Sequence, residues 1–313
     1  MRKVVQHAFG GTEVLDLIEA ARPVPAPTEV LIRVHGAGVN PVDAAVRSGA
    51  LPLLGRPPFT LGWDVAGVVE AVEPGVTRFK PGDEVYGLPF FPREAGAYAD
   101  YVVAPSRQLA RKAANLSALE AAALPLVGLT AWQGLVDVAG LDVAEGRQLV
   151  VVHGGGGGVG HVAVQIAKAY GAEVVATASA AKADFVRSLG ADLVVDYRSE
   201  DFARVVDGAD IVYDTVGGYA ERSLRVLKPG GILVTATERR DLELAARVEA
   251  AGFRWGALTV EPDYPALEAM TVLAEAGRLR PHLGHVLPLE QVADAHKLIE
   301  SGHSTGKIVL SLL

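Results

Sequence analysis

The chain has 313 residues, of which 50% are hydrophobic, and a formal net charge of -8 at pH 7. A chain of this length can bury two cores of ordinary domain size, so two domains are expected. It has no cysteine, which excludes disulfides and thiolate metal sites and leaves only histidine and carboxylate for any metal. Its charges form no long acidic or basic runs, so we expect a small-molecule partner and neither nucleic acid nor an anionic membrane.

The start of the chain has the pattern of a strand. No stretch of 18 or more uninterrupted apolar residues occurs, and the first residues lack the long apolar region of a signal peptide. Val4, Gln6 and Ala8 alternate in character after Met1 and the basic pair that follows it. These features predict a first β-strand in a cytoplasmic protein.

The first third of the sequence is rich in glycine, proline and short alternating runs. Short strands separated by such turn residues are typical of a compact, partly open β-barrel. The expected strands are Lys3 to Ala8, Val14 to Ala20, Glu29 to Val39, Asp64 to Val72, Asp83 to Gly87 and Ala97 to Val103.

From about Leu119 the pattern changes to apolar strands that alternate with segments of helix length. This alternation predicts right-handed βαβ units and the doubly wound parallel sheet of a Rossmann domain, so the fold class is α/β. The expected strands are 149–153, 173–178, 193–195, 210–213 and 232–235, and the expected helices are 158–170, 181–189 and 219–227.

The end of the sequence is too short to form a domain by itself. It contains an expected helix at 265–276, an extended piece around Val286, a second helix at 289–301 and a last strand at 307–310. We expect this tail to return and complete the first domain. The predicted division is therefore residues 1–118 with 260–313, and residues 119–259.

A glycine-rich turn follows the strand that ends at His153. Its sequence places Gly155, Gly157 and Gly160 at the three positions of the G-x-G-x-x-G pattern of dinucleotide-binding proteins. The first glycine allows a tight turn, the second lets amides approach a pyrophosphate, and the third allows a helix to pack closely. The whole segment, with Gly156, Gly158 and Val159, is the expected phosphate site at the start of a helix.

The residues after the second strand favour NADPH as the cofactor. A site for NAD usually has an acidic residue there, which binds the ribose 2′-hydroxyl. This chain has Ser179 at the tip of the strand, Lys182 shortly after it and Tyr197 after the third strand. These groups can bind a 2′-phosphate through charge-assisted hydrogen bonds. The alternative for Lys182 is an ordinary solvated residue on a helix.

Motifs along almost the whole chain resemble those of the zinc-independent quinone oxidoreductases of the medium-chain dehydrogenase/reductase superfamily. Together they are far more specific than the glycine turn alone. They are GVNPVD (38–43, with Arg47), LGWDVAGVV (61–69), KPGDEVYG (80–87), GAYADY (96–101), LPLVGLTAW (124–132), HGGGGGVGHVAVQIAKAYGA (153–172), SLGAD (188–192), VYDTVGG (212–218) and GKIVL (306–310).

The resemblance implies a GroES-like catalytic domain beside a Rossmann domain, with the active site in the cleft between them. It further implies that Asn40 and Asp43 flank the nicotinamide and the substrate, and that Thr130 lies near the nicotinamide and its phosphates. Val216 and Gly217 are implied as the backbone lining of the cofactor groove.

Two departures from related sequences bear on the chemistry. Zinc-dependent relatives carry a His-Glu pair where this chain has Trp63 and Asp64, and they carry a cysteine-rich lobe that is missing here. Some quinone reductases have a tyrosine after the aspartate of the GVN segment, where this chain has Ala44 and Ala45. The chain is therefore expected to lack zinc and to have no phenol at that position.

Without a metal, an alcohol is a poor substrate, because zinc normally lowers the pKa of the bound oxygen. Quinones and enones are already electrophilic, so positioning against a reduced nicotinamide supplies most of the catalysis. Negative charge then develops on the carbonyl oxygen, and Asn40, a tyrosine such as Tyr86 or a water could donate a hydrogen bond to it. We select Asn40 and expect the proton to come from solvent.

Several of these residues also have purely structural interpretations. Asp43 could cap the segment that follows it, and Thr130 could cap a helix that begins near Ala131. Trp63 could line a core. His153 and His161 are a poor pair of metal ligands because no carboxylate lies between them. Two further tyrosines, Tyr98 and Tyr101, look like strand residues that pack across a sheet.

Two other functions remain open. One is an enoyl-thioester reductase of the same superfamily, which needs a basic entrance that Arg222, Arg225 and Arg239 could supply. The other is a dinucleotide-binding sensor or scaffold without turnover. The substrate itself depends on the loops 51–59, 88–94 and 253–261. Residues 254–258 extend the last Rossmann strand, and such an edge could pair in a homodimer.

Overall fold

The computed structural model describes residues 1–313, and the chain divides into two compact units. Unit 1 comprises Met1–Leu129 and Glu261–Leu313, and unit 2 comprises Thr130–Val260. The first boundary thus lies after residue 129, whereas the sequence pattern placed it after residue 118. The difference arises because the helix α2 (Ala118–Ala122) packs against strands of unit 1. No helix of either unit has the length and apolar character needed to cross a membrane.

Unit 1 is built around a mainly antiparallel seven-stranded sheet with the order β14-β15-β3-β4-β5-β7, in which β6 also pairs with β3. Its long central strand is buried along most of its length, and only Arg33 is exposed. A separate hairpin is formed by β1 (Arg2–Gln6) and β2 (Leu15–Glu19). The sheet strands of the first segment are β3 (Glu29–Val39), β4 (Asp64–Val72), β5 (Glu84–Gly87), β6 (Tyr101–Pro105) and β7 (Leu109–Arg111).

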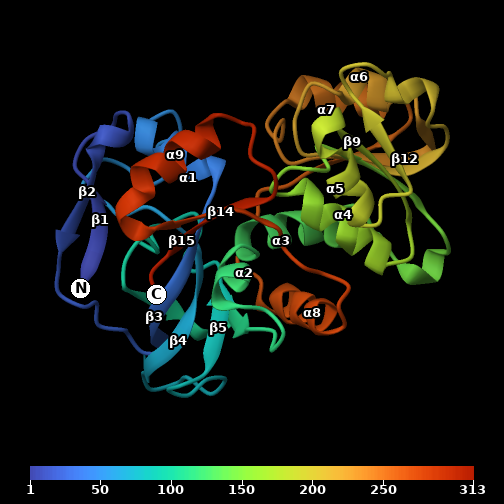
Figure 1. The fold of residues 1–313 in the computed structure, drawn as a ribbon. Coiled ribbons are helices and arrows are strands. Elements are labelled where there is room, and N and C mark those ends of the chain that lie inside the picture. The colour runs from blue at the N-terminus through green and yellow to red at the C-terminus, as the bar shows by residue number, and fades with distance from the viewer. The chain divides into compact units, whose positions relative to one another are not determined.

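The tail of the chain completes this sheet. Strand β15 (Lys307–Ser311) pairs antiparallel with β3, and β14 (Leu283–Pro288) pairs parallel with β15. Helix α9 (Val292–Glu300) packs against α1 (Pro41–Ser48), as Figure 1 also shows. Residues separated by more than 250 positions in the sequence therefore share one core.

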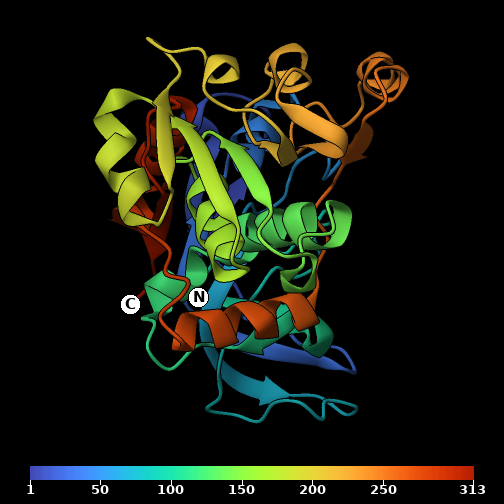
Figure 2. The ribbon, with the colours of Figure 1, turned by 90° about the vertical axis from the view of Figure 1, so that its right-hand side faces the viewer.

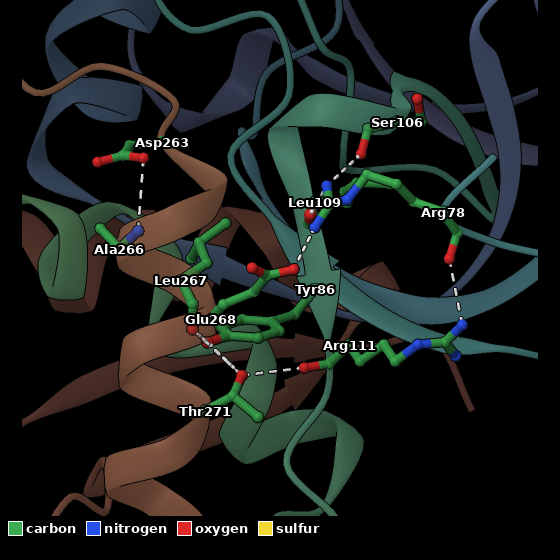
Figure 3. A network of polar contacts seen from close by, with 10 residues as sticks. All are labelled: Arg78, Tyr86, Ser106, Leu109, Arg111, Asp263, Ala266, Leu267, Glu268 and Thr271. Carbon is green, nitrogen blue, oxygen red and sulfur yellow. Dashed lines mark hydrogen bonds and ion pairs between the residues drawn. The ribbon is translucent and has the colours of Figure 1, made fainter. Parts of the chain in front are cut away.

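Polar contacts attach helix α8 (Tyr264–Glu275) to the strands of unit 1 (Figure 3). Arg78 pairs with Glu268 of α8 and also donates to the carbonyl oxygen of Leu109 at 2.9 Å. The buried hydroxyl of Tyr86 donates to the carbonyl oxygen of Leu267 at 2.7 Å. An exposed ion pair and a buried hydrogen bond thus hold the tail helix against the sheet.

Unit 2 contains six parallel strands in the order β10-β9-β8-β11-β12-β13. Numbered within the unit, the order is 3-2-1-4-5-6, which is that of a doubly wound dinucleotide-binding sheet and confirms the predicted fold class. Figure 2 shows the helices of this unit, coloured from yellow-green to orange, around the strands. The strands are β8 (Leu149–His153), β9 (Glu173–Ala178), β10 (Leu193–Asp196), β11 (Ala209–Asp214), β12 (Leu227–Thr235) and β13 (Arg254–Ala257).

Alternating side chains of these strands build the core of unit 2. Val151, Val212 and Leu233 point to one face, where they form a buried cluster with Leu244 and Val248 of helix α7 (Leu242–Ala250). Parallel strands are covered on both faces, which explains their nearly continuous apolar sequence. The helices are α4 (Gly160–Ala169), α5 (Ala183–Ser188), α6 (Ala220–Ser223) and α7 (Leu242–Ala250).

Two elements of unit 2 differ from the expectation. The helix predicted at 219–227 ends at Ser223, because Leu227 already pairs with Ala209 as the first residue of β12. Helix α7 was not predicted. It begins at the cap of Asp241, whose carboxylate accepts a hydrogen bond from the amide of Leu244 at 2.8 Å.

Candidate functional site

A glycine turn joins the end of β8 to the start of α4, and some of its glycines leave no room for a side chain. Gly154 has a φ of 78°. A Cβ on Gly160 would lie 2.1 Å from the carbonyl oxygen of Gly154, and one on Gly155 would lie 2.9 Å from the Cβ of Ala176 on β9. Gly160 therefore allows the first turn of α4 to touch the end of β8, as the motif predicts.

Gly157 is under a different constraint. A Cβ there would meet its nearest atom, the carbonyl oxygen of Gly154, at 3.3 Å, which the fold can accommodate with a small shift. Gly158 and Val159 complete the turn, and Val159 is the residue before the first residue of α4. The amino end of α4 carries the partial positive charge of the helix dipole. The turn thus forms a small cradle at which an anionic group is favoured.

Ser179, Lys182 and Tyr197 lie around the carboxyl end of β9. The amide of Tyr197 donates to the carbonyl oxygen of Ala178 at 3.3 Å, which places Tyr197 beside the end of this strand. The aliphatic part of Lys182 lies over the turn, because a Cβ on Gly156 would be 2.8 Å from its Cδ. Burial lowers the pKa of Lys182. The structure therefore brings Lys182 to the glycine turn and Tyr197 to the same strand end as Ser179.

Val216 and Gly217 follow the end of β11. The side chain of Val216 reaches the glycine turn, since a Cβ on Gly154 would lie 2.6 Å from its Cγ2. Both amides donate to Oδ1 of Asp214 at 2.9 Å. The side chain of Val216 is therefore available at the surface, where it is 54% exposed. The backbone amides of Val216 and Gly217 are already bound within the protein.

The two histidines that flank the turn are fully buried. Both ring nitrogens of His153 lie 3.2 Å from hydroxyl groups, those of Thr177 and Ser223. Nδ1 of His161 lies 2.9 Å from the carbonyl oxygen of Gly157. No group of three or more His, Asp or Glu side chains in the chain has an arrangement that could hold a metal ion. The contacts identify both histidines as parts of the protein interior.

In unit 1, Asn40 and Asp43 form the amino end of helix α1. Asn40 is the residue before the helix, and its amide donates to Oδ2 of Asp43 at 2.8 Å. Oδ1 of Asp43 accepts a second hydrogen bond, from the amide of Gly62, at 3.1 Å. The capping alternative for Asp43 therefore needs correction: Asn40 is the cap, and Asp43 is its partner three residues later.

The Asn40 side chain is held by two buried charged residues. Its Nδ2 donates to Oδ2 of Asp64 at 2.9 Å, and its Oδ1 accepts a hydrogen bond from the ammonium group of Lys307. Lys307 also donates to the carbonyl oxygen of Val39 at 3.1 Å and to Asp64 at 3.3 Å. The second oxygen of Asp64 accepts from the amide of Leu126 at 2.6 Å. These bonds fix the orientation of the side-chain amide of Asn40.

Burial raises the pKa of Asp43 to about 7. The carboxylate of Asp64 contributes to this rise, whereas the backbone amide of Asn40 and the charge of Lys307 oppose it. Tyr98 packs in the same interior, and burial together with the charge of Asp43 holds its pKa well above the ordinary value. The cluster can therefore take up or release a proton near neutral pH.

Two family models match the chain. The alcohol dehydrogenase GroES-like domain matches residues 26–114, and the zinc-binding dehydrogenase matches residues 189–310. An Arabidopsis thaliana protein named NADPH-dependent alkenal/one oxidoreductase, chloroplastic, is 37% identical over 99% of this chain and 79% of its own length. The structure of a quinone oxidoreductase from Coxiella burnetii has a TM-score of 0.91 and 33% identity, and it covers 100% of this chain and 99% of its own.

The chain belongs to the quinone oxidoreductase family of the medium-chain dehydrogenase/reductase superfamily. A similar structure of a mycobacterial protein, described as complexed with NADPH, has a TM-score of 0.86 and 30% identity. The match covers 99% of this chain and 100% of the mycobacterial chain. The GroES-like match and the doubly wound order of unit 2 confirm the predicted combination of folds.

In this family member, three aromatic residues of the family motifs serve the interior of unit 1. Trp63 is fully buried and donates through Nε1 to the carbonyl oxygen of Arg93 at 2.6 Å. Tyr98 precedes β6 and packs so closely on Gly62 that a Cβ there would be 2.5 Å from its ring. Tyr86 uses its hydroxyl to bind Leu267, as Figure 3 shows, and burial raises its pKa. Its alternative role as a donor to substrate is therefore wrong.

Thr130 lies within helix α3 (Pro125–Trp132). The helix begins five residues before it, so the alternative that Thr130 caps a helix near Ala131 is wrong. Its side chain is largely buried, and its carbonyl oxygen accepts a hydrogen bond from the hydroxyl of Tyr213 at 2.7 Å. A π-helical segment, Gln133–Val138, follows directly. Such segments often occur at functional sites.

Lys307 and its pairing with Asp64 are not evident from the sequence motifs. A lysine inside the apolar GKIVL strand was the available signal, because a buried lysine requires a charged partner. Thr177 was also missed. It occupies the strand before the expected 2′-phosphate site, and its hydroxyl accepts a hydrogen bond from the amide of Gly154 at 3.2 Å.

Proposed function

We propose that this member of the family is an NADPH-dependent reductase that transfers hydride to quinones or α,β-unsaturated carbonyl compounds without a metal. One observation carries the proposal: the glycine turn of unit 2 meets Lys182 and a strand end that has Ser179 in place of a carboxylate. The names of the relatives, which include an NADPH-dependent alkenal/one oxidoreductase and a quinone oxidoreductase, support it.

The residues of unit 2 fit a dinucleotide. In the cradle formed by Gly155 to Gly160, the surrounding protein leaves no room for a side chain at Gly155 or Gly160. At Gly157 the protein itself could accommodate a methyl group with a small shift. A glycine that the fold does not require is expected where the backbone must approach a pyrophosphate. Val216 lies over the turn, where it would cover the bound molecule, and Gly217 would line the same groove.

The end of β9 favours the 2′-phosphate. A carboxylate at this strand end would repel a phosphate dianion, and none is present at Ser179. The hydroxyls of Ser179 and Tyr197 can donate hydrogen bonds, and Lys182 supplies a positive charge. We therefore assign these three side chains to the 2′-phosphate of NADPH.

When bound, NADPH supplies the hydride, and the protein supplies orientation and electrostatic stabilisation. Lys307 and Asp64 hold the Asn40 amide with its oxygen on the ammonium group. Nδ2 of Asn40 has two hydrogens, and one of them binds Asp64. In this proposal the other stabilises negative charge on the substrate carbonyl oxygen, which requires the Asn40 side chain, 0% exposed in this structure, to be uncovered when the substrate binds. Asp43 secures the backbone of Asn40, and Thr130 contacts the nicotinamide in this proposal.

The donor set of unit 1 explains why we assign no zinc. Asp64 stands where zinc-dependent relatives have the glutamate of the His-Glu pair, and both of its oxygens are bound, by Lys307, Asn40 and Leu126. The neighbouring Trp63 is no metal ligand, and the chain has no cysteine. The ammonium group of Lys307 already supplies the positive charge beside Asp64.

A substrate panel tests the proposal directly. Oxidation of NADPH and of NADH is followed with 1,4-benzoquinone, an alkyl enone and crotonyl-CoA, each with and without a chelator. We expect turnover of the quinone or the enone with NADPH and no effect of the chelator. Preference for NADH contradicts the cofactor assignment, and loss of activity with chelator contradicts the metal-free mechanism.

The same panel separates the alternatives. Fast turnover of crotonyl-CoA alone indicates an enoyl-thioester reductase. Tight binding of NADPH without turnover of any acceptor indicates a sensor or scaffold. Each outcome is distinct because cofactor binding is measured separately, by fluorescence.

We also propose a homodimer that forms at the free edge of the unit 2 sheet. Strand β13 is the last strand of this sheet, so one side of its backbone lacks a strand partner. An exposed strand edge is a ready template for pairing with a second copy. Light scattering at working concentration tests this, and a monomer mass would contradict it.

A further inference from the structure

We infer that His153 is a positioning residue, whose imidazole connects the glycine turn to β9 and α6 and so holds the backbone of the turn in place for the pyrophosphate of NADPH. This rests on the NADPH site proposed above, but it concerns a side chain that the proposed reaction does not use. His153 is the last residue of β8 and directly precedes Gly154.

The ring of His153 lies in a line of hydrogen bonds that begins at the turn. The amide of Gly154 lies 3.2 Å from Oγ1 of Thr177, which in turn lies 3.2 Å from Nδ1 of His153. On the other side of the ring, Nε2 lies 3.2 Å from Oγ of Ser223. The hydroxyl of Ser223 donates to the carbonyl oxygen of Tyr219 at 2.8 Å. The line therefore runs from the turn to the first residues around α6.

The direction of each bond follows from counting hydrogens. The single hydroxyl hydrogen of Ser223 is used on Tyr219, so Ser223 can only accept a bond from His153. Nε2 of His153 must then carry the hydrogen. Nδ1 of a neutral ring is left as an acceptor, and Thr177 donates to it while accepting from Gly154. Only the neutral ring with its hydrogen on Nε2 satisfies every member of the line.

The surroundings keep the ring in this state. The pKa of His153 is lowered to about 4, mainly by burial; Asp214 opposes this shift and Arg222 adds to it. The ring is stacked on Tyr219 with centroids 4.5 Å apart and an angle of 19° between the planes. Phe202 contacts it edge-on, with a centroid distance of 4.6 Å. The imidazole is thus neutral at physiological pH and packed against two aromatic rings.

The turn depends on this anchor because its own bonds start at Gly154. The amide of Gly157 donates to the carbonyl oxygen of Gly154 at 2.9 Å, and the amide of Gly155 donates to the carbonyl oxygen of Thr177 at 2.9 Å. Thr215 fixes the backbone of His153 itself, by donating to its carbonyl oxygen at 2.7 Å. A shift of Thr177 or His153 therefore passes into the backbone that would bind the pyrophosphate.

The experiment compares four variants. Three are the single substitutions His153→Phe, His153→Asn and Thr177→Val, and the fourth combines His153→Phe with Thr177→Val. Phenylalanine keeps the stacking and removes both hydrogen bonds, whereas asparagine keeps a polar atom near the Nδ1 position. The Kd for NADPH is measured by fluorescence without a substrate, and kcat is measured at saturating NADPH. The thermal midpoint of each apo-protein is recorded alongside.

We expect His153→Phe and Thr177→Val each to raise the Kd for NADPH about tenfold, the size of one lost hydrogen bond with a buried partner. The double variant should be little worse than either single one, since both cut the same line. His153→Asn should recover part of the affinity. In all variants kcat should stay within about twofold, because the chemistry is untouched once the cofactor is bound.

A purely structural role predicts a different result. It lowers the thermal midpoint and the active fraction, and so the apparent kcat, while the Kd for NADPH stays unchanged; that result overturns the inference. The ¹⁵N NMR spectrum of the imidazole gives a second test, with Nε2 protonated and Nδ1 unprotonated down to pH 5 expected. A hydrogen on Nδ1 also overturns it. If the wild-type protein does not bind NADPH, the proposed cofactor is wrong and this inference falls with it.

Discussion

Two alanine substitutions in the glycine turn should weaken NADPH binding for different reasons. In Gly160→Ala, the new methyl group starts 2.1 Å from the carbonyl oxygen of Gly154 and 2.7 Å from its carbonyl carbon, both of them backbone atoms. Ordinary van der Waals contact begins at 3.4 Å, so α4 and the end of β8 must move apart by more than 1 Å. Overpacking of this kind costs about 1–3 kcal/mol, and a turn displaced by about 1 Å loses about 100-fold in function.

Gly157→Ala is the matched variant. Its methyl group meets the nearest protein atom at 3.3 Å, so the apo-protein should keep its stability, while the group projects into the space that the pyrophosphate is proposed to approach. We expect Gly160→Ala to lower the thermal midpoint of the apo-protein by several degrees and to raise the Kd for NADPH. Gly157→Ala should raise the Kd alone. The reasoning is refuted if Gly160→Ala melts and binds NADPH like the wild type, or if Gly157→Ala destabilises the apo-protein.

Three further changes test the remaining assignments. Ser179→Asp places a carboxylate at the end of β9 and should raise the KM for NADPH at least about tenfold while lowering the KM for NADH. An equal change in both KM values would count against the 2′-phosphate site. Asp43 binds its proton more tightly folded than unfolded, since its pKa rises to about 7, so unfolding free energy should fall as the pH rises from about 4 to 7. Asp43→Asn should flatten that dependence in denaturant titrations, and an unchanged slope would contradict the assignment. Lys307→Met leaves the buried carboxylate of Asp64 unpaired and should cost about 3–5 kcal/mol. The double variant with Asp64→Asn should recover part of it, and full additivity of the two losses would argue against the pair.

Local features were predictable from the sequence because they depend on neighbours along the chain. The order of strand, glycine turn and helix around Gly155 to Gly160 follows from hydrophobic period and backbone freedom. The missing acid at Ser179 is read directly from the residue. For the same reason the parallel sheet of unit 2 followed from the alternation of strands and helices.

Long-range partners could not be derived in this way. Lys307 lies 243 positions after Asp64, and no local pattern states that β15 pairs with β3 and brings the two charges together. Tyr86 shows the same limit, since only the packing of α8 reveals that its hydroxyl is already bound to Leu267. The sequence by itself determined the class of fold and the kind of cofactor turn. The tertiary structure decided which buried polar groups satisfy one another, because burial makes each of them dependent on a partner that the chain supplies from elsewhere.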